Sequence, residues 1–276
     1  MYLKGSMKLS VFRNQCKQEF EKLNIDKFDV DCIFAEVLNM KTTELHVDIE
    51  LTYEQIKLIN SAVVRRKSGE PVTKIFNKAY FFGQEFYVDN NVLSPRPETE
   101  ILVEYAIDWL KSSQSNCTVL DLCTGSGAIA CSIAKLSNVE VYASDISSKA
   151  LDIAKRNARN LGCDIKFVLS DMFTNISGQF DMIISNPPYI ETEVCKTLDV
   201  EVKEHDPMLA LDGGEDGLDY YRIIASNMHY LKKGGILLME IGYNQAESIK
   251  TIFNNYHVTI VKDYGNNDRI AIVKGV

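Results

Sequence analysis

The sequence predicts an α/β protein built on a doubly wound, mainly parallel sheet of seven strands, with a small helical bundle at the N-terminus and a β-hairpin linker between the two. Three observations lead to this prediction. From about residue 117 onward, short apolar runs alternate with segments of helical periodicity, which is typical of parallel strands covered by helices on both faces. Before residue 79 the periodicity is helical alone. Two aromatic runs separated by the residues Gly-Gln-Glu stand between these regions.

The N-terminal region, residues 1–78, is expected to form a helical bundle. Apolar residues spaced three or four apart indicate a first helix; they are Leu9, Phe12, Cys16, Phe20 and Leu23. A second group indicates another helix and consists of Ile33, Phe34, Val37 and Leu38. Thr52 and Gln55 have the spacing of a capping box that starts a third helix. We expect these residues to form a separate domain whose outer face docks a substrate.

A β-hairpin and a proline-rich break come next. The aromatic runs 80–82 and 86–88 flank residues 83–85, Gly-Gln-Glu, and this pattern is typical of a hairpin. The sequence Ser-Pro-Arg-Pro then interrupts the chain before a helix that is expected to begin near Glu98. We therefore expect a hairpin linker over residues 79–97.

The large domain, residues 98–276, supplies the predicted sheet. Its candidate strands are short apolar runs at residues 118–122, 140–144, 165–169, 180–185, 235–241, 257–262 and 269–273. Helical patterns fill most of the gaps, as in residues 148–161 and 216–231. Because only a short turn separates the last two strands, these two are expected to pair antiparallel.

Composition and charge narrow the functional classes. The chain is 46% hydrophobic and 25% charged, and no stretch approaches the roughly 20 apolar residues of a membrane helix. The N-terminus lacks the apolar segment of a secretory signal. The seven scattered cysteines form no Cys-x-x-Cys pair, so we expect reduced thiols and no metal site. Residues 1–78 carry 13 basic and 11 acidic side chains against 17 and 27 in the rest, which argues against a broad nucleic-acid surface. We expect a cytoplasmic protein with neither a membrane nor a nucleic acid as a direct partner.

A glycine-rich loop follows the first strand of the predicted sheet. Residues 121–128 read Asp-Leu-Cys-Thr-Gly-Ser-Gly-Ala, and glycines there let a ligand approach the backbone at the N-terminus of a helix. Asp145 ends the next strand, where a carboxylate can accept both hydroxyls of a ribose. These residues alone suit NAD and an adenosyl group equally, and a plain tight turn is the alternative.

The tetrapeptide Asn186-Pro187-Pro188-Tyr189 follows the strand 180–185 and is expected at the carboxyl edge of the sheet, where α/β proteins bind ligands. Its two prolines remove two backbone donors and stiffen the loop. The side-chain oxygen of Asn186 and the carbonyl of Pro187 are then two acceptors that suit an NH2 group, and Tyr189 offers a face to a planar amide or nucleobase. A proline-rich turn without a chemical role is the alternative.

Together these residues resemble the Rossmann-like class I S-adenosylmethionine-dependent methyltransferases that methylate planar nitrogens. Residues 94–100, Ser-Pro-Arg-Pro-Glu-Thr-Glu, and the segment 206–218 are similar to segments of the HemK/PrmC family, the N5-glutamine methyltransferases of peptide-chain release factors. The resemblance spans nearly the whole chain. Three residues depart from the family pattern: Cys123 stands where Gly is common, Ser94 replaces an apolar residue and Asp206 replaces Glu.

The resemblance implies methyl transfer from S-adenosylmethionine to the N5 nitrogen of the glutamine in the Gly-Gly-Gln motif of release factors, which modulates translation termination. The implied cofactor site, with Asp145 on the ribose and Met172 beside the adenine, consists of Cys123, Thr124, Gly125, Ser126, Gly127, Asp145, Met172 and Asn186. A core-filling role is the alternative for Met172. The implied catalytic residues are Asn186, Pro187 and Tyr189, and with Pro188 they form the implied substrate site. We expect a monomer that needs no metal.

Other functions stay open at this point. N6-adenine methyltransferases share the Asn-Pro-Pro-Tyr tetrapeptide and would hold a flipped base with the same two acceptors, although the acidic large domain counts against nucleic acid. An NAD-dependent oxidoreductase would have only Tyr189 of the tetrapeptide as a proton donor. The non-enzymatic alternative is a scaffold that binds a ligand without catalysis, and the intact glycines, Asp145 and tetrapeptide argue against it.

Overall fold

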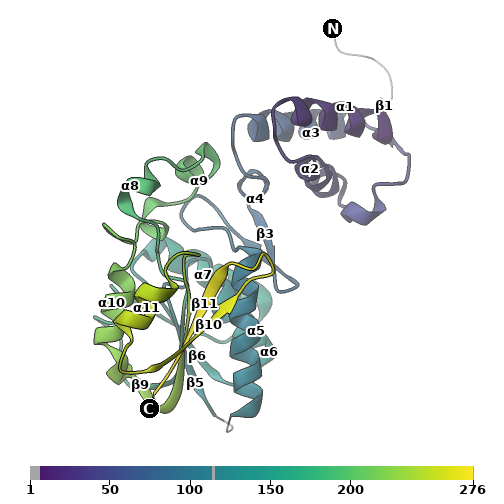
Figure 1. Ribbon diagram of the computed structural model, residues 1–276. Coiled ribbons are helices and arrows are strands. Elements are labelled where there is room, and N and C mark those ends of the chain that lie inside the picture. The colour runs from purple at the N-terminus through teal and green to yellow at the C-terminus, as the bar shows by residue number, and fades with distance from the viewer. Residues whose placement is uncertain (1–6, 114–115, 276) are drawn as a thin grey trace. The chain divides into compact units, whose positions relative to one another are not determined.

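The computed structural model describes residues 7–113 and 116–275, and the chain divides into two compact units, Met1–Asn77 and Lys78–Val276 (Figure 1). The first unit is helical and the second contains a seven-stranded sheet, so the predicted fold class is confirmed. Within the described ranges, no helix combines the length and the apolar character that crossing a membrane would require.

The N-terminal unit is a helical bundle with one short pair of strands. Its elements are β1 (Met7–Lys8), α1 (Leu9–Lys22), α2 (Phe28–Leu38), η1 (Thr42–Glu44), β2 (Glu50–Leu51), α3 (Tyr53–Lys67) and α4 (Val72–Ile75). The predicted stripe on the first helix lies in the bundle core, with one exception. Leu23 is 53% exposed, because α1 ends at Lys22 and the residue lies beyond the buried face.

Helix α3 begins at the predicted capping box. Oγ1 of Thr52 accepts a hydrogen bond from the backbone N of Gln55 at 3.2 Å, and Oε1 of Gln55 accepts one from the backbone N of Thr52 at 2.9 Å. This exchange satisfies two backbone donors that a helix N-terminus otherwise leaves unpaired. The prediction from the spacing of these two residues is confirmed.

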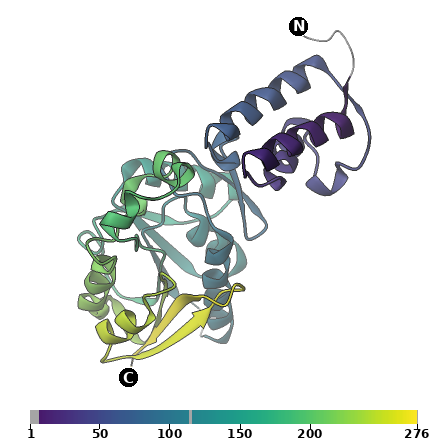
Figure 2. The same ribbon diagram turned by 45° about the horizontal axis from the view of Figure 1, so that its top comes forward.

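One sheet organises the second unit. Its strands are β5 (Thr118–Leu122), β6 (Glu140–Asp145), β7 (Lys166–Leu169), β8 (Phe180–Ser185), β9 (Leu231–Glu240), β10 (His257–Lys262) and β11 (Asp268–Lys274). They follow the order β10-β11-β9-β8-β5-β6-β7, and the five strands from β9 to β7 are parallel. Strand β11 runs antiparallel to both β9 and β10, which confirms the predicted pairing of the last two strands (Figure 2). Strand β9 starts at Leu231, earlier than the predicted residue 235.

The helical segments of this unit are α5 (Pro97–Ser112), α6 (Ala128–Leu136), α7 (Ser148–Leu161), α8 (Thr192–Cys195), α9 (Val200–His205), η2 (Met208–Ala210), α10 (Asp219–Ser226), η3 (Met228–Tyr230) and α11 (Ala246–Ile252). The single helix predicted over residues 216–231 is wrong in extent, because it is divided into α10 and η3. Helix α5 begins with Pro97, whose missing N–H costs nothing in the first turn of a helix.

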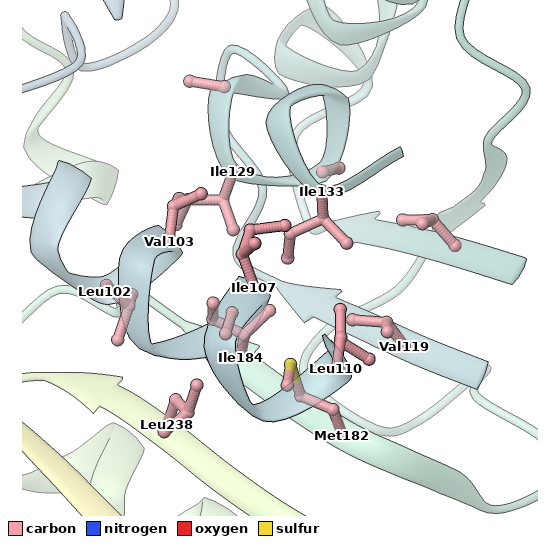
Figure 3. Close-up of a cluster of buried hydrophobic side chains, with 14 of the residues drawn as sticks. Leu102, Val103, Ile107, Leu110, Val119, Ile129, Ile133, Met182, Ile184 and Leu238 are labelled. Atoms are coloured by element: carbon pink, nitrogen blue, oxygen red, sulfur yellow. The ribbon is translucent and has the colours of Figure 1, made fainter. Parts of the chain in front are cut away.

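Alternate residues of the strands face opposite layers. Val119 of β5 packs into the core that α5 and α6 cover, whereas its neighbour Leu120 packs into the core that α10 and α11 cover. The first of these cores is drawn in Figure 3, where Leu102 and Ile107 of α5 point toward the strands. Because both faces of the sheet are covered, the strands read as continuous apolar runs in the sequence.

The hairpin consists of β3 (Lys78–Phe81) and β4 (Gln84–Tyr87), which pair antiparallel. Its turn is formed by Phe82 and Gly83, with φ of +49° and +71°, and two positive φ values are typical of a tight two-residue hairpin turn. The prediction that residues 83–85 form the turn is therefore wrong. Gln84 and Glu85 belong to β4.

A buried asparagine on α7 joins this hairpin to the glycine-rich loop. Oδ1 of Asn157 accepts a hydrogen bond from the backbone N of Tyr87 at 2.8 Å. Its Nδ2 donates to the backbone oxygens of Tyr87 and Ser126, both at 2.9 Å. Asn157 carries no signal in the sequence, because its three backbone partners lie far from it along the chain.

Replacing Asn157 by leucine is expected to lower the free energy of unfolding by about 2–4 kcal/mol, because one buried and two partly buried backbone groups lose their partner. Urea unfolding followed by the fluorescence of Trp109, the single tryptophan, measures this change in the second unit. Asn160→Leu, an exposed position on the same helix, is the matched control. Equal stability of the two variants would contradict the assignment.

Candidate active site

A cavity of about 210 Å³ lies at the carboxyl edge of the sheet in the second unit. Loops that follow β5, β6, β7 and β8 contribute to its lining, as expected for ligand sites in parallel sheets. The predicted site residues that line it are Cys123, Thr124, Gly125, Ser126, Asp145, Met172, Asn186 and Pro188. The lining thus brings together predicted site residues that are up to 65 positions apart in the sequence, from Cys123 to Pro188.

The backbone of the glycine-rich loop turns sharply over the cavity. Cys123, Gly125 and Gly127 have positive φ values of +63°, +54° and +79°. The first value explains why glycine is common at the position of Cys123 in the family pattern noted above, because glycine adopts this conformation without strain and cysteine does not. Cys123 therefore holds a backbone shape that glycine commonly supplies.

Gly127 lies at the end of the glycine-rich loop and is not among the described residues that line the cavity. It is the N-cap of α6, and a Cβ at this position would lie 3.0 Å from the Cβ of Ala154 on α7. Its function is thus close packing of the loop against a helix. The predicted cofactor contact of Gly127 stays a prediction.

Asp121 braces the loop from inside the sheet. Its fully buried carboxylate accepts hydrogen bonds at Oδ2 from Oγ1 of Thr124 at 2.6 Å and from the backbone N of Ala130 at 3.1 Å. Burial raises the pKa of Asp121 to about 7, although both hydrogen bonds act in the opposite direction. Oδ1 is buried and accepts no hydrogen bond from the described residues.

Asp145 lies at the end of β6 and lines the cavity. Its Oδ2 accepts a hydrogen bond from the backbone N of Gly125, and its Oδ1 accepts one from the backbone N of Ser147, both at 2.9 Å. Burial raises the pKa of Asp145, and these two hydrogen bonds limit the rise. Each carboxylate oxygen can accept a second hydrogen bond. The site therefore retains acceptors for a ligand with hydroxyl groups.

Met172 both lines the cavity and packs in the core. It is 6% exposed, and its Sδ lies 3.7 Å from Sγ of Cys123. Its φ of +44° is unusual for a residue with a side chain, and such backbone strain is concentrated at functional sites. Burial raises the pKa of the Cys123 thiol well above its usual range. The two sulfur atoms thus form a neutral, polarizable patch on the wall.

The tetrapeptide after β8 is divided between the cavity and the protein interior. Asn186 and Pro188 line the cavity, and Nδ2 of Asn186 lies 3.3 Å from Oγ1 of Thr99. Pro187 and Tyr189 stand outside the described lining. The hydroxyl of Tyr189 donates to Oε1 of Glu240 at 3.3 Å, and its carbonyl accepts from Nε2 of Gln245 at 2.9 Å.

Several cavity residues were not predicted as site residues. They are Asn90, Asn91, Val92, Leu93, Ser94, Pro95, Arg96, Thr99, Leu122, Ala128, Ile129, Ser144, Ile146, Ser147, Ala150, Ser170, Asp171, Pro207, Leu209, Ala210 and Tyr220. Residues 94–99 and 207–210 fall in the two segments whose resemblance to the HemK/PrmC family was noted, so a signal for them existed. Arg96 and Asp206 connect these segments, because their side chains form an ion pair at 3.1 Å.

Comparison with known proteins identifies the family of this chain. The Methyltransferase small domain family matches residues 99–204, and the PrmC N-terminal domain family matches residues 12–76. A release factor glutamine methyltransferase of Agrobacterium fabrum is 39% identical, with 88% of each chain covered. One of Caulobacter vibrioides is 37% identical, covering 93% of this chain and 92% of that protein. The chain belongs to the release factor glutamine methyltransferase family.

Membership of the release factor glutamine methyltransferase family confirms the predicted resemblance. A solved structure with the same fold is a methyltransferase from Pyrococcus furiosus, with a TM-score of 0.53 at 18% identity; the match covers 79% of this chain and 98% of that one. S-adenosylmethionine is accordingly the methyl donor, as predicted. The cavity fits this group, because it offers the open backbone of Gly125, the carboxylate of Asp145 and the apolar wall at Met172.

The two glycines are expected to respond differently to alanine. Both variants carry a side chain at positive φ, which costs about 1–2 kcal/mol, and Gly127→Ala in addition collides with Ala154. No described atom lies within 4 Å of the added carbon in Gly125→Ala, so this methyl group extends into open space at the cavity. Titration calorimetry should show S-adenosylmethionine binding weakened about tenfold or more in Gly125→Ala. Urea unfolding should show the larger loss of stability in Gly127→Ala, and the reverse order would contradict both assignments.

Asp121→Asn is expected to alter how stability depends on pH. The pKa of Asp121 is about 7 in the folded chain and about 4 in an unfolded chain. The folded chain therefore keeps a proton that the unfolded chain releases, so the free energy of unfolding falls as pH rises between these values. The variant should lack this fall, which amounts to about 2–3 kcal/mol between about pH 5 and pH 8. Urea unfolding at both pH values measures it, with the exposed Asp164→Asn as control; parallel curves for Asp121→Asn and the wild type would refute it.

Proposed function

We propose that this chain transfers a methyl group from S-adenosylmethionine to the N5 nitrogen of the glutamine in the Gly-Gly-Gln motif of peptide-chain release factors. Family membership supports the reaction and the substrate class. The observation that carries the proposal is the place of Asn186. Its carboxamide lines the same cavity as the glycine-rich loop and Asp145, and the described residues donate no hydrogen bond to its Oδ1.

The chemistry requires orientation more than activation by a base. The lone pair of an amide nitrogen is delocalised into its carbonyl, so the nitrogen is a weak nucleophile. Bound S-adenosylmethionine supplies a methyl group made electrophilic by its sulfonium. The chain's own task is to hold the flat amide so that its nitrogen faces that methyl group, and fixed orientation of this kind lowers a barrier by up to about 7–11 kcal/mol.

We assign this orientation to the tetrapeptide. Oδ1 of Asn186 and the carbonyl of Pro187 accept the two amide hydrogens, and these acceptors stabilise the positive charge that develops on nitrogen. Pro188 stiffens the loop. Tyr189 is only half-buried, and we assign its ring to packing against the flat substrate amide.

Proton release follows the transfer and needs no strong base. The nitrogen becomes acidic only after it carries the methyl group, so water can take its proton. Burial and the nearby charge of Glu240 raise the pKa of Tyr189 well above its usual range, which keeps its hydroxyl protonated. The role of Tyr189 is therefore that of a neutral hydrogen-bond donor and packing surface.

We assign the cofactor contacts in the same way. The backbone of residues 123–127 lies along the cofactor, Asp145 accepts the ribose hydroxyls and Met172 lies beside the adenine. The retained acceptor capacity of Asp145 and the position of Met172 in the cavity wall support these roles.

We further propose that residues 1–78 dock the release factor, that residues 79–97 act as a linker and that residues 98–276 carry the methyltransferase site. Large apolar side chains exposed on the N-terminal unit support a docking role; they are Val11, Leu23, Phe28, Val47, Tyr53, Leu58 and Val64. We also propose that the chain works as a cytoplasmic monomer without direct nucleic-acid binding, in line with its net charge of −8.

Asn186→Ala is expected to lower the turnover of release factor methylation about a hundredfold or more, because one of the two acceptors is lost. S-adenosylmethionine binding should change much less. Mass spectrometry of a release factor incubated with the enzyme and labelled cofactor measures the gain of one methyl group on the Gly-Gly-Gln glutamine.

Asn227→Ala, at the half-buried C-cap asparagine of α10, is the control and should retain wild-type turnover. Duplex DNA offered in the same reaction tests N6-adenine methylation, which the relatives do not favour. Wild-type methylation of DNA in place of the release factor would overturn the proposed function, and full activity of Asn186→Ala would overturn the acceptor role.

A further inference from the structure

A chain of buried polar side chains ends at the carboxamide of Asn186. Nδ2 of Asn186 lies 3.3 Å from Oγ1 of Thr99, and that oxygen lies 2.6 Å from Oε2 of Glu240. Thr99 belongs to the first turn of α5, and Glu240 is the last residue of β9. They are only 4% and 2% exposed, so solvent does not compete for these hydrogen bonds.

The number of hydrogens that Asn186, Thr99 and Glu240 can donate decides which way the carboxamide of Asn186 faces. An ionised carboxylate only accepts hydrogen bonds, so the single hydroxyl hydrogen of Thr99 points to Glu240. The oxygen of Thr99 can then only accept from Asn186, which must present its NH2 group. Oδ1 of Asn186 is thereby turned away from Thr99, and the described residues give it no donor.

The same carboxylate also holds the other end of the tetrapeptide. Oε1 of Glu240 accepts a hydrogen bond from the hydroxyl of Tyr189 at 3.3 Å, and its backbone oxygen accepts one from the hydroxyl of Tyr221 at 2.9 Å. Burial raises the pKa of Glu240, whereas the hydrogen bond from Thr99 and the positive charge of Arg269 lower it. Burial is the larger effect, and these donors limit the rise by stabilising the ionised carboxylate, the form to which the count of hydrogens applies.

We propose that Thr99 and Glu240 are positioning residues that fix the carboxamide of Asn186 with its oxygen toward the substrate amide. This inference rests on the proposed function and deepens it. Without the hydroxyl of Thr99, the carboxamide can rotate by half a turn and present its NH2 group to the substrate. In that orientation the NH2 group of Asn186 faces the NH2 group of the substrate, so two hydrogen-bond donors oppose each other. The substrate amide then loses Oδ1 of Asn186 as one of its two acceptors.

Kinetics of three variants test the proposal. Thr99→Val keeps the shape of the side chain and removes the hydroxyl, and Glu240→Gln lets an NH2 group face Thr99. In both, kcat for release factor methylation should fall about tenfold to a hundredfold, with KM for the release factor and cofactor affinity changed no more than about threefold. Thr99→Ser restores the hydroxyl and should keep kcat within about threefold of the wild type.

Thr118→Val is the matched control. Thr118 also donates its hydroxyl to a carboxylate, that of Asp181 at 3.0 Å, but it lies at the opposite end of the sheet. Its loss should leave kcat unchanged. A fall in kcat for Thr118→Val equal to that for Thr99→Val would show a general loss of packing and overturn the proposal.

A second measurement does not depend on activity. In protein labelled with 15N, the side-chain NH2 signals of Asn186, assigned by their loss in Asn186→Ala, report its hydrogen bond. They should shift and broaden in Thr99→Val and stay in place in Thr99→Ser. Unchanged NH2 signals in Thr99→Val would overturn the proposal. So would a wild-type kcat for Thr99→Val in an assay in which the wild type methylates the release factor. An inactive wild type would overturn the proposed function alone, because the NH2 signals still decide the orientation.

Discussion

The parallel alignment of the central strands is the constraint on which the site depends. Leu122 of β5 pairs with Ser144 of β6 and with Ser185 of β8, so these strands end together at one edge of the sheet. Loops that are distant in the sequence consequently open into one cavity. The glycine-rich loop, Asp145 and Asn186 become neighbours through this register. Among the described residues, Asn186 forms no direct hydrogen bond with the loop or with Asp145.

Buried polar side chains convert this proximity into a defined geometry. Asp121 holds the start of the glycine-rich loop, Asn157 connects that loop to the hairpin, and Glu240 receives the hydroxyls of Thr99 and Tyr189. All three side chains are almost completely buried. Loss of one of their hydrogen bonds would leave a buried polar group unpaired, which would lower the stability of the fold. The loops are therefore restrained from the interior, and their cavity-facing atoms stay available.

Backbone strain is concentrated in the same loops. Cys123 and Met172 both adopt positive φ values, and their sulfur atoms are neighbours. Such conformations cost about 1–3 kcal/mol each and persist where the surrounding structure enforces them. Here the enforcement is visible at Met172, whose carbonyl accepts a hydrogen bond from the buried hydroxyl of Ser170. The strained backbone at the cavity wall lowers the stability of the fold, and the buried apolar side chains of the two cores offset this loss.

The sequence by itself determined the seven strands of the sheet, apart from the start of β9, the capping box at Thr52 and the presence of a glycine-rich turn after β5, because these follow from periodicity and from neighbours within a few residues. It also placed Asp145 and Asn186 at the correct edge, since parallel strands share one. The tertiary structure alone decided that the turn lies at Phe82 and Gly83, that Tyr189 bonds to Glu240 and that Thr99 meets Asn186. The two side-chain contacts depend on the packing of α5 and β9 beside the end of β8, and no local preference of the chain specifies which side chains meet there.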